Sequence, residues 1–557
     1  MLSTEILIGA ESFREIRENN YCYIDKTSFI EEMLSQIPPK VSLITRPRRF
    51  GKTLTMSMLQ EFFDIKKSSK ALFEGLSISK NNEICSKWMN KYPTVFITLK
   101  DIQSLIFDEA KELFQGYITR LYDDHTYLLD SSNVSTSDKK RIDNIVKGKL
   151  SFSDTVFSLF NLTHALESYW NKQIILLIDE YDSPIHYAQA NGYYDEMINL
   201  LRSFFSQALK SNFSLKFAVI TGCLRISKES MFSGLNNFKC YSISDEKFSD
   251  KIGFTKSDVE ELMSSANLYD KKDVLKEWYD GYNFGNNTNI YCPWDVLMFV
   301  NDLQDNAMSK PKTYWKNTSN NDIIHTLVNK ANTSTKEKIE TLISGGTIAE
   351  LLPEDLSYEH IYNNDSSIWS ILYFTGYLTK ATKQIDEELI SLIIPNQEIK
   401  TIFKDTIYEW FIDTLDSEAI NTFIQAIWHA DAESLQKIMT KILYSTISYY
   451  DNAESYYHGF FTGLLRGAGL HPLSNREHGI GRPDIIIENK NSKTATIIEI
   501  KASKKYEDLE NDTNKALQQI EVKKYDSTFS FKVDTIIKYG IAFWKKECSV
   551  KVTKKSI

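Results

Sequence analysis

The chain has 557 residues, of which 42% are hydrophobic and 25% charged, a balance typical of a globular protein rather than a disordered one. Its net charge of −9, from 65 Lys and Arg against 74 Asp and Glu, excludes a protein that coats nucleic acid through its overall charge. There is no run of roughly 18 apolar residues for a membrane helix, no secretory signal pattern, and no CxxC pair among six scattered cysteines. We therefore expect a cytoplasmic protein without membrane contact, with reduced thiols and neither a disulfide framework nor a zinc site.

At about 150 residues per domain, the length suggests three or four domains. Within 1–240, apolar runs alternate with helical stretches, which predicts a parallel sheet covered on both faces. Residues 241–440 read mainly as helices, one of them expected to begin at Ser257 with Glu260 completing an S-x-x-E capping box. Residues 441–557 read as a helix, two or three strands, a helix and a strand. The apolar runs of the first region are VSLIT (41–45), TVFITL (94–99), QIILLID (173–179) and LKFAVIT (215–221).

Charge is unevenly distributed along the chain. Residues 471–557 hold 17 Lys or Arg and 12 Asp or Glu, a net +5, which leaves −14 on the rest. A basic end on an acidic body indicates that the C-terminal part handles any polyanion. A solvated lysine-rich tail explains the same count equally well.

The run RPRRFGKT follows the first predicted strand and precedes an apolar helix face. Gly51, Lys52 and Thr53 thus stand where a strand turns into a helix N-terminus, the context of a P-loop, with Lys52 for phosphates and Thr53 for Mg²⁺. The first glycine of that motif is replaced by Arg46, and Pro47 has no N–H to offer. Arg48 and Arg49 add positive charge.

QIILLID runs into Asp179 and Glu180, the pattern of a Walker B strand. Asp179 is expected to hold Mg²⁺ through a water and Glu180 to activate the attacking water. A solvated acidic turn at a strand end is the alternative. Thr221 ends the next strand and could sense the γ-phosphate, while Arg225 could act as an arginine finger, although ordinary turn chemistry explains both as well.

Two strands, DIIIE (484–488) and ATIIEIK (495–501), flank the turn-prone loop NKNSKT. The loop is centred at 491.5, and so is the pair 484 and 499, so a regular hairpin places Asp484 opposite Glu499. Two carboxylates about 5 Å apart repel each other, and a shared divalent cation offsets that repulsion.

Side-chain alternation puts Lys501 on the same face as Glu499. Two metal-binding carboxylates and an adjacent ammonium are a phosphodiester-cleaving set, with Mg²⁺ as the expected ion. Glu477 is a further acidic candidate, and Gln519 on the next helix a polar one. The alternative is a solvent-exposed hairpin with a Glu499–Lys501 ion pair.

With these residues in hand, the sequence resembles bacterial AAA-ATPase-like proteins that carry a C-terminal PD-(D/E)XK nuclease domain, over nearly the whole chain. In that family, arginine is usual in the first P-loop position, where this chain has Arg46. The motifs that carry the resemblance are YIDKTSFI (23–30), RPRRFGKT (46–53), LIDEYDSP (177–184), TGCLRISKESMFSGLNN (221–237), WYDGYNFG (278–285), YHGFFTGLL (457–465), SNREHGIGRPD (474–484) and EIKAS (499–503).

The resemblance implies an α/β fold with a P-loop NTPase (AAA-like) parallel-sheet domain at 1–240, a mainly helical lid or linker at 241–440, and an αβββαβ nuclease-like domain at 441–557. The resemblance also assigns residues by motif. The residues themselves add Arg46, Arg49, Gly51, Thr221 and Arg225 to the expected nucleotide-binding set. Lys52 and Thr53 match Walker A, Asp179 and Glu180 match Walker B, Pro483-Asp484 and Glu499-x-Lys501 match the nuclease signature, and Gln519 matches a supporting polar position.

We expect an ATP-binding, Mg²⁺-dependent nuclease whose ATPase gates the cutting of DNA, which is favoured over RNA. The main alternative is a regulatory NTP switch that binds partners or nucleic acid without cleaving it. Another is a nuclease on a nucleotide-binding scaffold that never hydrolyses ATP. The sequence leaves the oligomeric state open, with a homo-oligomer among the alternatives.

Overall fold

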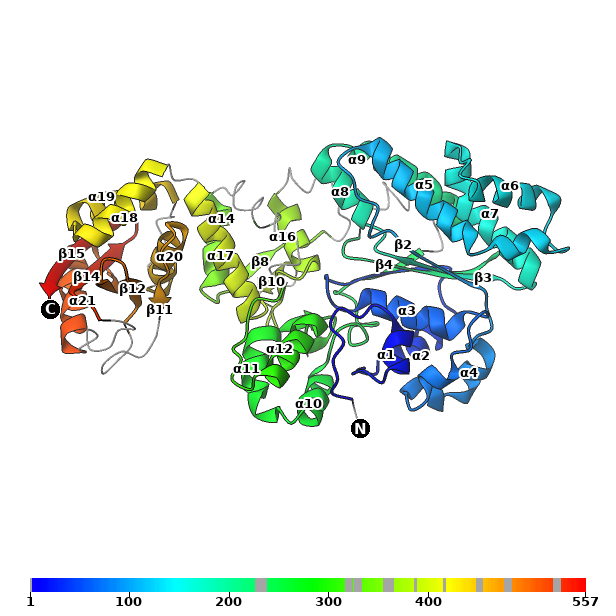
Figure 1. Cartoon of the computed structure of the whole chain (residues 1–557), viewed down its shortest axis with the longest axis horizontal. Coiled ribbons are helices and arrows are strands. Elements are labelled where there is room, and N and C mark those ends of the chain that lie inside the picture. The colour runs from blue at the N-terminus through cyan, green and yellow to red at the C-terminus, as the bar shows by residue number, and fades with distance from the viewer. Residues whose placement is uncertain are drawn as a thin grey trace. The chain divides into compact units, whose positions relative to one another are not determined.

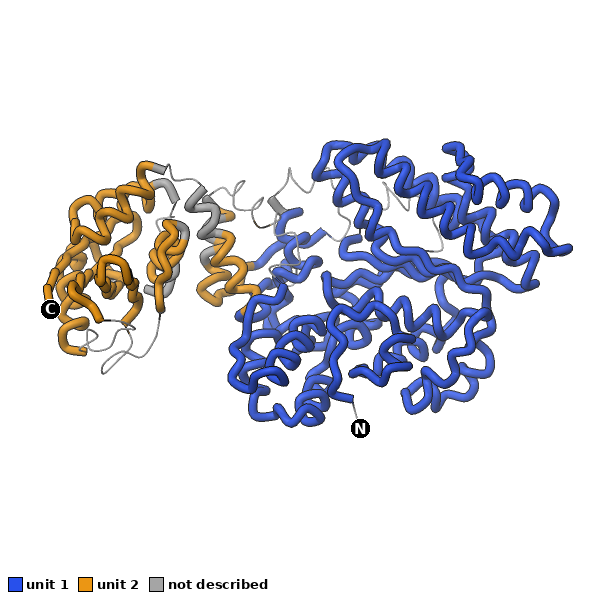
Figure 2. Tube along the Cα trace, in the orientation of Figure 1, with its two compact units in different colours: residues 1–315, 349–397 blue, residues 316–348, 398–557 orange. Residues whose placement is uncertain are grey.

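The computed structural model describes residues 3–225, 238–315, 324, 333–353, 365–384, 388–413, 417–446, 454–474, 483–523 and 532–557. The chain divides into two compact units (Figure 2). Unit 1 comprises Met1–Trp315 and Ala349–Gln397, and unit 2 comprises Lys316–Ile348 and Glu398–Ile557. The mainly helical middle is shared between them, and the three boundaries expected from the sequence stay predictions.

Unit 1 is built around a five-stranded sheet in which every pairing is parallel, with the order β2-β3-β4-β1-β5. The four predicted apolar runs are confirmed as strands, and their Val-, Ile- and Leu-rich sequences are buried because helices cover both faces. The fifth strand is an addition that the sequence reading missed. The strands are β1 (Val41–Thr45), β2 (Thr94–Thr98), β3 (Ile174–Asp179), β4 (Leu215–Gly222) and β5 (Phe238–Tyr241).

Two groups of helices enclose this sheet (Figure 1). One face is covered by α1 (Phe13–Glu18), α2 (Ser28–Leu34), α3 (Lys52–Phe63) and α4 (Asn82–Trp88), and the other by α5 (Phe107–Asp123), α6 (Thr136–Val146), α7 (Phe152–Trp170), α8 (Ser183–Asn191) and α9 (Tyr194–Leu209). Short 3₁₀ turns lie at η1 (Lys70–Phe73), η2 (Ser77–Lys80) and η3 (Thr126–Asp130). The carboxyl ends of the parallel strands are thereby left as the open edge of the sheet.

The remainder of unit 1 is mainly helical. The helix expected at Ser257 is α10, but its capping box is formed by Thr255 and Asp258, so the predicted Ser257–Glu260 box was wrong. The Thr255 hydroxyl accepts from the Asp258 N–H, which satisfies a helix donor two residues earlier than expected. The elements are α10 (Lys256–Ser265), η4 (Tyr269–Lys271), α11 (Lys272–Tyr279), β6 (Tyr282–Phe284), β7 (Asn287–Ile290), α12 (Pro293–Asp305), β8 (Ile348–Glu350), α16 (Asp365–Phe374), β9 (Thr379–Lys380) and β10 (Ile390–Ile393).

Unit 2 holds a second five-stranded sheet, of order β11-β12-β13-β14-β15. Only the β13–β14 pair is parallel, with α21 as its crossover, and the other pairs are antiparallel. The order from α20 to β14 is helix, three strands, helix, strand, as the resemblance implies. The strands are β11 (Leu473–Ser474), β12 (Ile485–Asn489), β13 (Thr494–Ala502), β14 (Thr535–Trp544) and β15 (Glu547–Ser556).

Both faces of this sheet are apolar. Ile498 and Ile500 belong to a core that reaches α18, α19 and α20, whereas Ile486 and Ile497 pack with Ile520 of α21. Alternate residues of one strand therefore enter different cores, which fixes the register because a shift by one residue would exchange the faces. The helices are α14 (Thr333–Ile343), α17 (Gln397–Asp413), α18 (Ser417–His429), α19 (Ala432–Thr446), α20 (Glu454–Gly467) and α21 (Leu509–Val522), with a turn η5 (Tyr506–Asp508).

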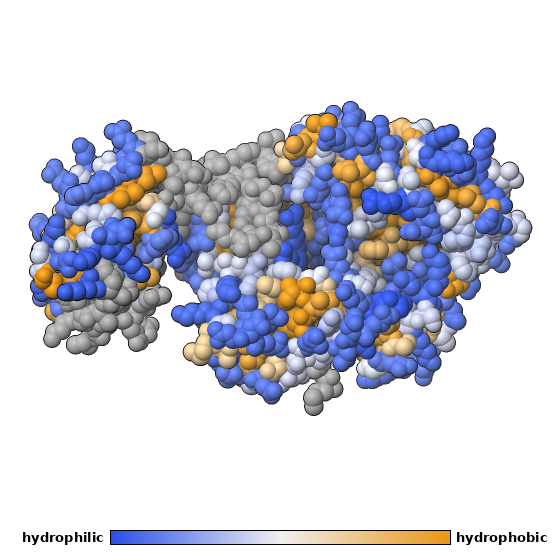
Figure 3. All heavy atoms as spheres, viewed as in Figure 1, coloured by the Kyte–Doolittle hydropathy of each residue, from blue (hydrophilic) through white to orange (hydrophobic). Residues whose placement is uncertain are grey.

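Polar side chains dominate the face in Figure 3, with hydrophobic ones in several separate patches. All six cysteines are free thiols. In the part of the chain that the structure describes, no helix combines the length and apolar character needed to span a bilayer.

Candidate functional sites

Arg46, the residue in place of the first P-loop glycine, is fully buried. Its guanidinium donates to the carbonyl oxygens of Thr45 (2.7 Å), Tyr241 (3.2 Å) and Phe248 (2.7 Å). Burial lowers its pKa to about 10, which still leaves the group charged at neutral pH. Because Tyr241 ends β5 and Phe248 follows it, Arg46 joins the phosphate loop to the segment after the neighbouring strand.

This arrangement predicts a structural rather than a phosphate-binding effect of Arg46. Arg46→Leu would leave buried carbonyl oxygens without donors, which costs about 2–4 kcal/mol in the free energy of unfolding of unit 1. We expect the midpoint of its thermal unfolding to fall by on the order of 5–10 °C. Arg120→Leu, at an exposed position of α5, is the matched control and should leave the midpoint unchanged. Equal midpoints for both variants would contradict the assignment.

The N-terminus of α3 faces the open edge of the sheet. Gly51 precedes the helix with φ +88°, a left-handed conformation that glycine adopts without strain, and no side chain caps the helix. The first backbone N–H groups of α3 therefore have no intrahelical acceptor. Such a terminus, with the positive end of the helix dipole, attracts phosphate.

Lys52 bends back over the phosphate loop. Its Nζ donates to the carbonyl oxygens of Arg46 (3.2 Å) and Pro47 (3.0 Å) and lies 3.5 Å from Cys223 Sγ. Burial alone would lower the pKa of Lys52, but the Cys223 thiol and nearby carboxylates, among them Glu180, raise it overall. A buried ammonium is thus held over the loop, where phosphate oxygens could replace the two carbonyls.

Two hydroxyls converge on Asp179, which is completely buried at the end of β3. Thr53 donates to Oδ2 (2.6 Å), and Thr221, at the end of β4, donates to Oδ1 (2.5 Å). Burial raises the pKa of Asp179, while the two hydroxyl donors oppose that rise. A carboxylate and a threonine hydroxyl in contact at a helix N-terminus are a donor set suited to Mg²⁺ beside a nucleotide.

The residues after Asp179 hold the end of β4 in place. Asp182 accepts the N–H groups of Cys223 (2.8 Å) and Leu224 (3.0 Å), and the Tyr181 hydroxyl donates to the Leu224 carbonyl (2.7 Å). A Cβ at Gly222 would come within 2.5 Å of the Tyr181 ring, so only glycine fits there. These contacts, which the sequence reading missed, connect the Walker B segment to Thr221.

Glu180 has a φ of +53°, a conformation rare outside glycine, and it lines the cavity beside the phosphate loop. Strain of this kind gathers at functional sites, where the fold holds a side chain in a set direction. Arg225 lies at the end of the described segment that follows β4 and is partly buried.

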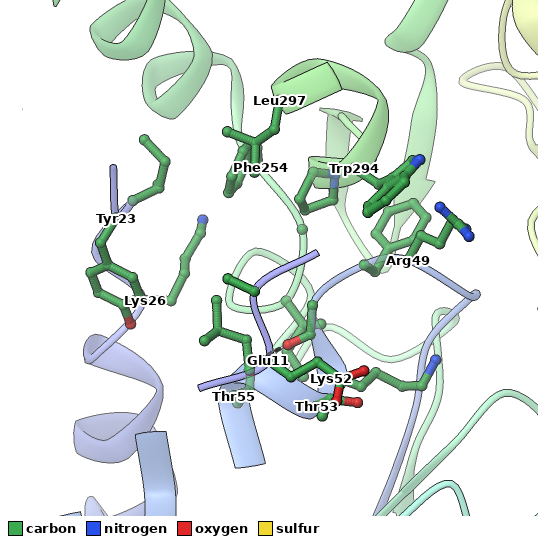
Figure 4. A pocket seen from close by; sticks show the side chains of 18 of the residues that line it. Glu11, Tyr23, Lys26, Arg49, Lys52, Thr53, Thr55, Phe254, Trp294 and Leu297 are labelled. Atoms are coloured by element: carbon green, nitrogen blue, oxygen red, sulfur yellow. Dashed lines mark hydrogen bonds between the residues drawn. The ribbon is translucent and has the colours of Figure 1, made fainter. Parts of the chain in front are cut away.

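A cavity of about 310 Å³ opens next to Lys52 and Thr53. Figure 4 shows its lining, with Phe254 and Leu297 on the side away from Lys52. Arg49 stacks its guanidinium 4.1 Å from the centre of the Trp294 ring, also in the lining. A phosphate-binding helix end, an apolar wall and an arginine stacked on a tryptophan ring suit the two ends of a nucleotide.

In unit 2 the hairpin register is the predicted one. Ile485 pairs with Ile498, so the next position places Asp484 opposite Glu499. The Asp484 N–H donates to Glu499 Oε2 (3.4 Å), and Asp484 Oδ2 accepts the Ile500 N–H (2.8 Å). The Asp484 carbonyl lies 2.9 Å from Nε2 of His458 on α20. Both carboxylates thus meet at one end of the β12–β13 hairpin.

Glu499 is 1% exposed, and its pKa rises to about 7, mainly through burial and then through the charge of Asp484. Lys501 opposes that rise, with its Nζ 3.5 Å from Glu499 Oε1. The Gln519 amide donates to the same oxygen. The structure therefore brings together Asp484, Glu499, Lys501 and Gln519, whereas Glu477 lies outside the described residues.

A close approach of α21 to β14 places Gln519. Gly540 pairs with Glu499, and a Cβ at Gly540 would lie 2.5 Å from the Thr513 carbonyl and 2.8 Å from the Leu517 N. Any larger residue would push the helix outward and carry the Gln519 amide away from Glu499. A glycine inside a strand, in YGIAFW, was the sequence signal for this approach.

The residues present fit a divalent cation at this site. A buried carboxylate whose pKa is raised by a second carboxylate gains from a cation that both can bind. Among the described residues, no group of three or more His, Cys, Asp or Glu side chains gathers as a metal site. Two carboxylates agree with Mg²⁺, which keeps several waters and takes only one or two carboxylates from the protein.

Two parts of the chain match families of known proteins. Residues 7–232 match the family model described as a predicted AAA-ATPase, and residues 452–553 match that of the PD-(D/E)XK nuclease superfamily. The chain is also 24% identical over 411 residues to the "Uncharacterized protein in vnfD 5'region" of Azotobacter chroococcum mcd 1. That alignment covers 73% of this chain and 70% of the relative.

Proposed function

Because this chain joins a domain of the predicted AAA-ATPase family to a domain of the PD-(D/E)XK nuclease superfamily, we propose that it is an ATP-hydrolysing, Mg²⁺-dependent nuclease that cleaves phosphodiester bonds of DNA. The meeting of Asp484 with the buried Glu499 beside Lys501 carries this proposal, because two carboxylates placed together need a cationic partner of the kind that a nuclease uses. ATP binding or turnover in unit 1 gates the cut.

In the ATPase half, the base and ribose occupy the cavity bounded by Phe254 and Leu297, and the phosphates lie on the N-terminus of α3. Lys52 exchanges its two loop carbonyls for β- and γ-phosphate oxygens. Thr53 and Asp179 hold the metal ion of the nucleotide. Glu180 orients and deprotonates the attacking water. Thr221, at the end of β4, senses the γ-phosphate, and Arg225 is the candidate arginine finger.

In the nuclease half, Asp484 and Glu499 would hold Mg²⁺, which would lower the pKa of a bound water and neutralise phosphate charge. Other residues of the chain orient the two carboxylates. The Ile500 N–H fixes one oxygen of Asp484, and Gln519 fixes one oxygen of Glu499, so both carboxylates point to one place. Lys501 positions the water and stabilises the negative charge that develops on the oxygens of the reacting phosphate.

DNA is the proposed substrate because the cutting end carries the basic surplus of the chain. Residues 471–557 have a net charge of +5, whereas the rest has −14. Lysine contacts to backbone phosphates give an affinity that falls steeply with salt. The negatively charged rest of the chain repels DNA and so directs it to unit 2.

The experiment measures ATP turnover and DNA cleavage in the same reactions. The full chain is incubated with linear and with circular DNA and Mg²⁺, without nucleotide, with ATP, and with a non-hydrolysable ATP analogue. We expect Mg²⁺-dependent cutting at a rate that changes with ATP and a different rate with the analogue. ATP hydrolysis without cleavage would favour a regulatory NTP switch, and cleavage without ATP turnover would favour a nuclease on a passive nucleotide-binding scaffold.

A further inference from the structure

A group of aromatic and basic side chains lies at the carboxyl ends of β13 and β14, with Tyr506 exposed and Trp544 and Lys545 partly buried. The Tyr506 ring, 56% exposed, meets the Trp544 ring edge to face with centroids 5.5 Å apart. Lys545 places its Nζ 4.8 Å from the centre of the Trp544 ring. We call Tyr506, Trp544 and Lys545 the aromatic platform.

The aromatic platform shares a face of the sheet with the two carboxylates. In the parallel β13–β14 pair, Glu499 lies beside Gly540 and Lys501 beside Ala542. Side chains alternate along a strand, so the next residue of β14 on that face is Trp544. It lies four residues beyond Gly540, the residue beside Glu499, which is about 13 Å along the strand and about the length of two extended nucleotide steps.

Neither ring belongs to a described apolar core, although Trp544 is partly buried. The described apolar cores of unit 2 include Phe543, which stacks on Tyr457 at 4.5 Å on the opposite face, but neither Trp544 nor Tyr506. Large rings held at a surface beside a catalytic edge are typical of a binding site rather than of a core.

The two chain segments that carry the aromatic platform have a net positive charge, in a protein of net charge −9. The segments 501–508 and 544–547 together hold more basic than acidic residues, and the Glu547 carboxylate accepts the Tyr444 hydroxyl (2.5 Å). A nucleotide has a base and a phosphate, and each finds a partner here. The aromatic rings offer a stacking face to a base, and the lysines attract its phosphates. The basic residues are Lys501, Lys504, Lys505, Lys545 and Lys546, and the acidic ones are Glu507, Asp508 and Glu547.

We propose that the aromatic platform stacks an unpaired base about two nucleotides from the phosphodiester at Asp484 and Glu499, so that the substrate is DNA with a single-stranded end or flap at the cut. The inference rests on the proposed function, whose substrate class it names. A base inside a duplex is already stacked on both faces and offers none to a protein ring. Duplex DNA therefore contacts the lysines but stacks no base on the rings.

The test measures binding of the full chain, in EDTA so that nothing is cut, to a fluorescent single-stranded oligonucleotide and to its duplex. We expect Trp544→Ala to weaken single-strand binding by roughly 5- to 150-fold, the range for loss of one base–aromatic stack, and duplex binding by less than about threefold. Trp544→Phe, which keeps a ring, should recover most of the single-strand affinity. A 2-aminopurine at the stacked position should lose its fluorescence quenching in Trp544→Ala.

Two further variants separate stacking from general damage. Tyr506→Ala removes a mostly exposed ring and should weaken single-strand binding without lowering thermal stability. Tyr269→Ala is the matched control, because Tyr269 is 44% exposed and also carries a lysine, Lys272, over its ring at 4.2 Å, but it lies in unit 1. The control should bind both DNAs as the wild type does.

The outcomes distinguish this inference from the proposed function. Unchanged single-strand binding in Trp544→Ala and Tyr506→Ala, or an equal loss for single strand and duplex, would overturn the platform even if the chain cuts DNA. A ring-dependent preference for single strands in a chain that cuts no DNA would support the platform and overturn the proposed nuclease activity.

Discussion

Glu499→Gln should lower the rate of DNA cleavage about a thousandfold, because it replaces a metal-binding carboxylate by a neutral amide of the same size. Folding should not suffer. The carboxyl is buried with a pKa of about 7, so its ionised form is disfavoured in the folded protein, and the amide also ends its repulsion by Asp484. We expect the variant to be at least as stable as the wild type at pH 8, while ATP turnover is unchanged.

The pH dependence of the free energy of unfolding provides a second test of the role of the Glu499 side chain. Between pH 4.5, the ordinary pKa of a glutamate, and about 7, folded metal-free protein keeps a proton on Glu499 that the unfolded chain has lost. The folded state then binds more protons, so the contribution of Glu499 to stability falls as pH rises through that window. Denaturant unfolding of the wild type in EDTA should show this slope, and Glu499→Gln should lack it.

Glu418→Gln is the matched control, since Glu418 is an exposed glutamate near the N-terminus of α18 in the same unit. It should cleave DNA at the wild-type rate and keep the pH slope. Cleavage that persists in both variants would remove the Asp484–Glu499 pair from the chemistry, whatever its geometry.

The hairpin that carries this site could be predicted from the sequence because its register follows from symmetry. A short polar loop between two Ile-rich runs has one centre, and the pairing Ile485–Ile498 fixes the same centre. Asp484 and Glu499 then had to face each other. The P-loop was found for a similar reason, because strand, glycine turn and helix follow one another along the chain without any long-range contact.

Contacts between distant segments could not be predicted in the same way. The guanidinium of Arg46 bonds to carbonyls about 200 residues away, and nothing in RPRRFGKT indicates them. The place of Gln519 depends on how closely α21 approaches Gly540. At α10 both Thr255 and Ser257 could cap, and local sequence alone did not decide between them.

Lys52→Ala should reduce ATP hydrolysis by about 10²–10³-fold, because the ammonium that would contact the transferred phosphate is lost. Its Nζ is held over the phosphate loop by two carbonyls and has no second lysine beside it in the described loop, so no neighbouring ammonium replaces it. The nuclease residues lie in unit 2 and keep their geometry. We therefore expect Lys52→Ala to retain Mg²⁺-dependent cleavage at the rate seen without nucleotide but to lose any response to ATP.

Lys80→Ala provides the control for this loss, because Lys80 is an exposed lysine of unit 1 at the end of η2. Parallel measurements of ATP turnover and DNA cleavage in the two variants separate binding at the P-loop from gating. If ATP still changes the cleavage rate in Lys52→Ala while ATP turnover is abolished, the signal to the nuclease does not start from hydrolysis at this loop. If cleavage itself disappears together with ATP turnover, the nuclease depends on the nucleotide-bound state of unit 1 and has no basal activity of its own.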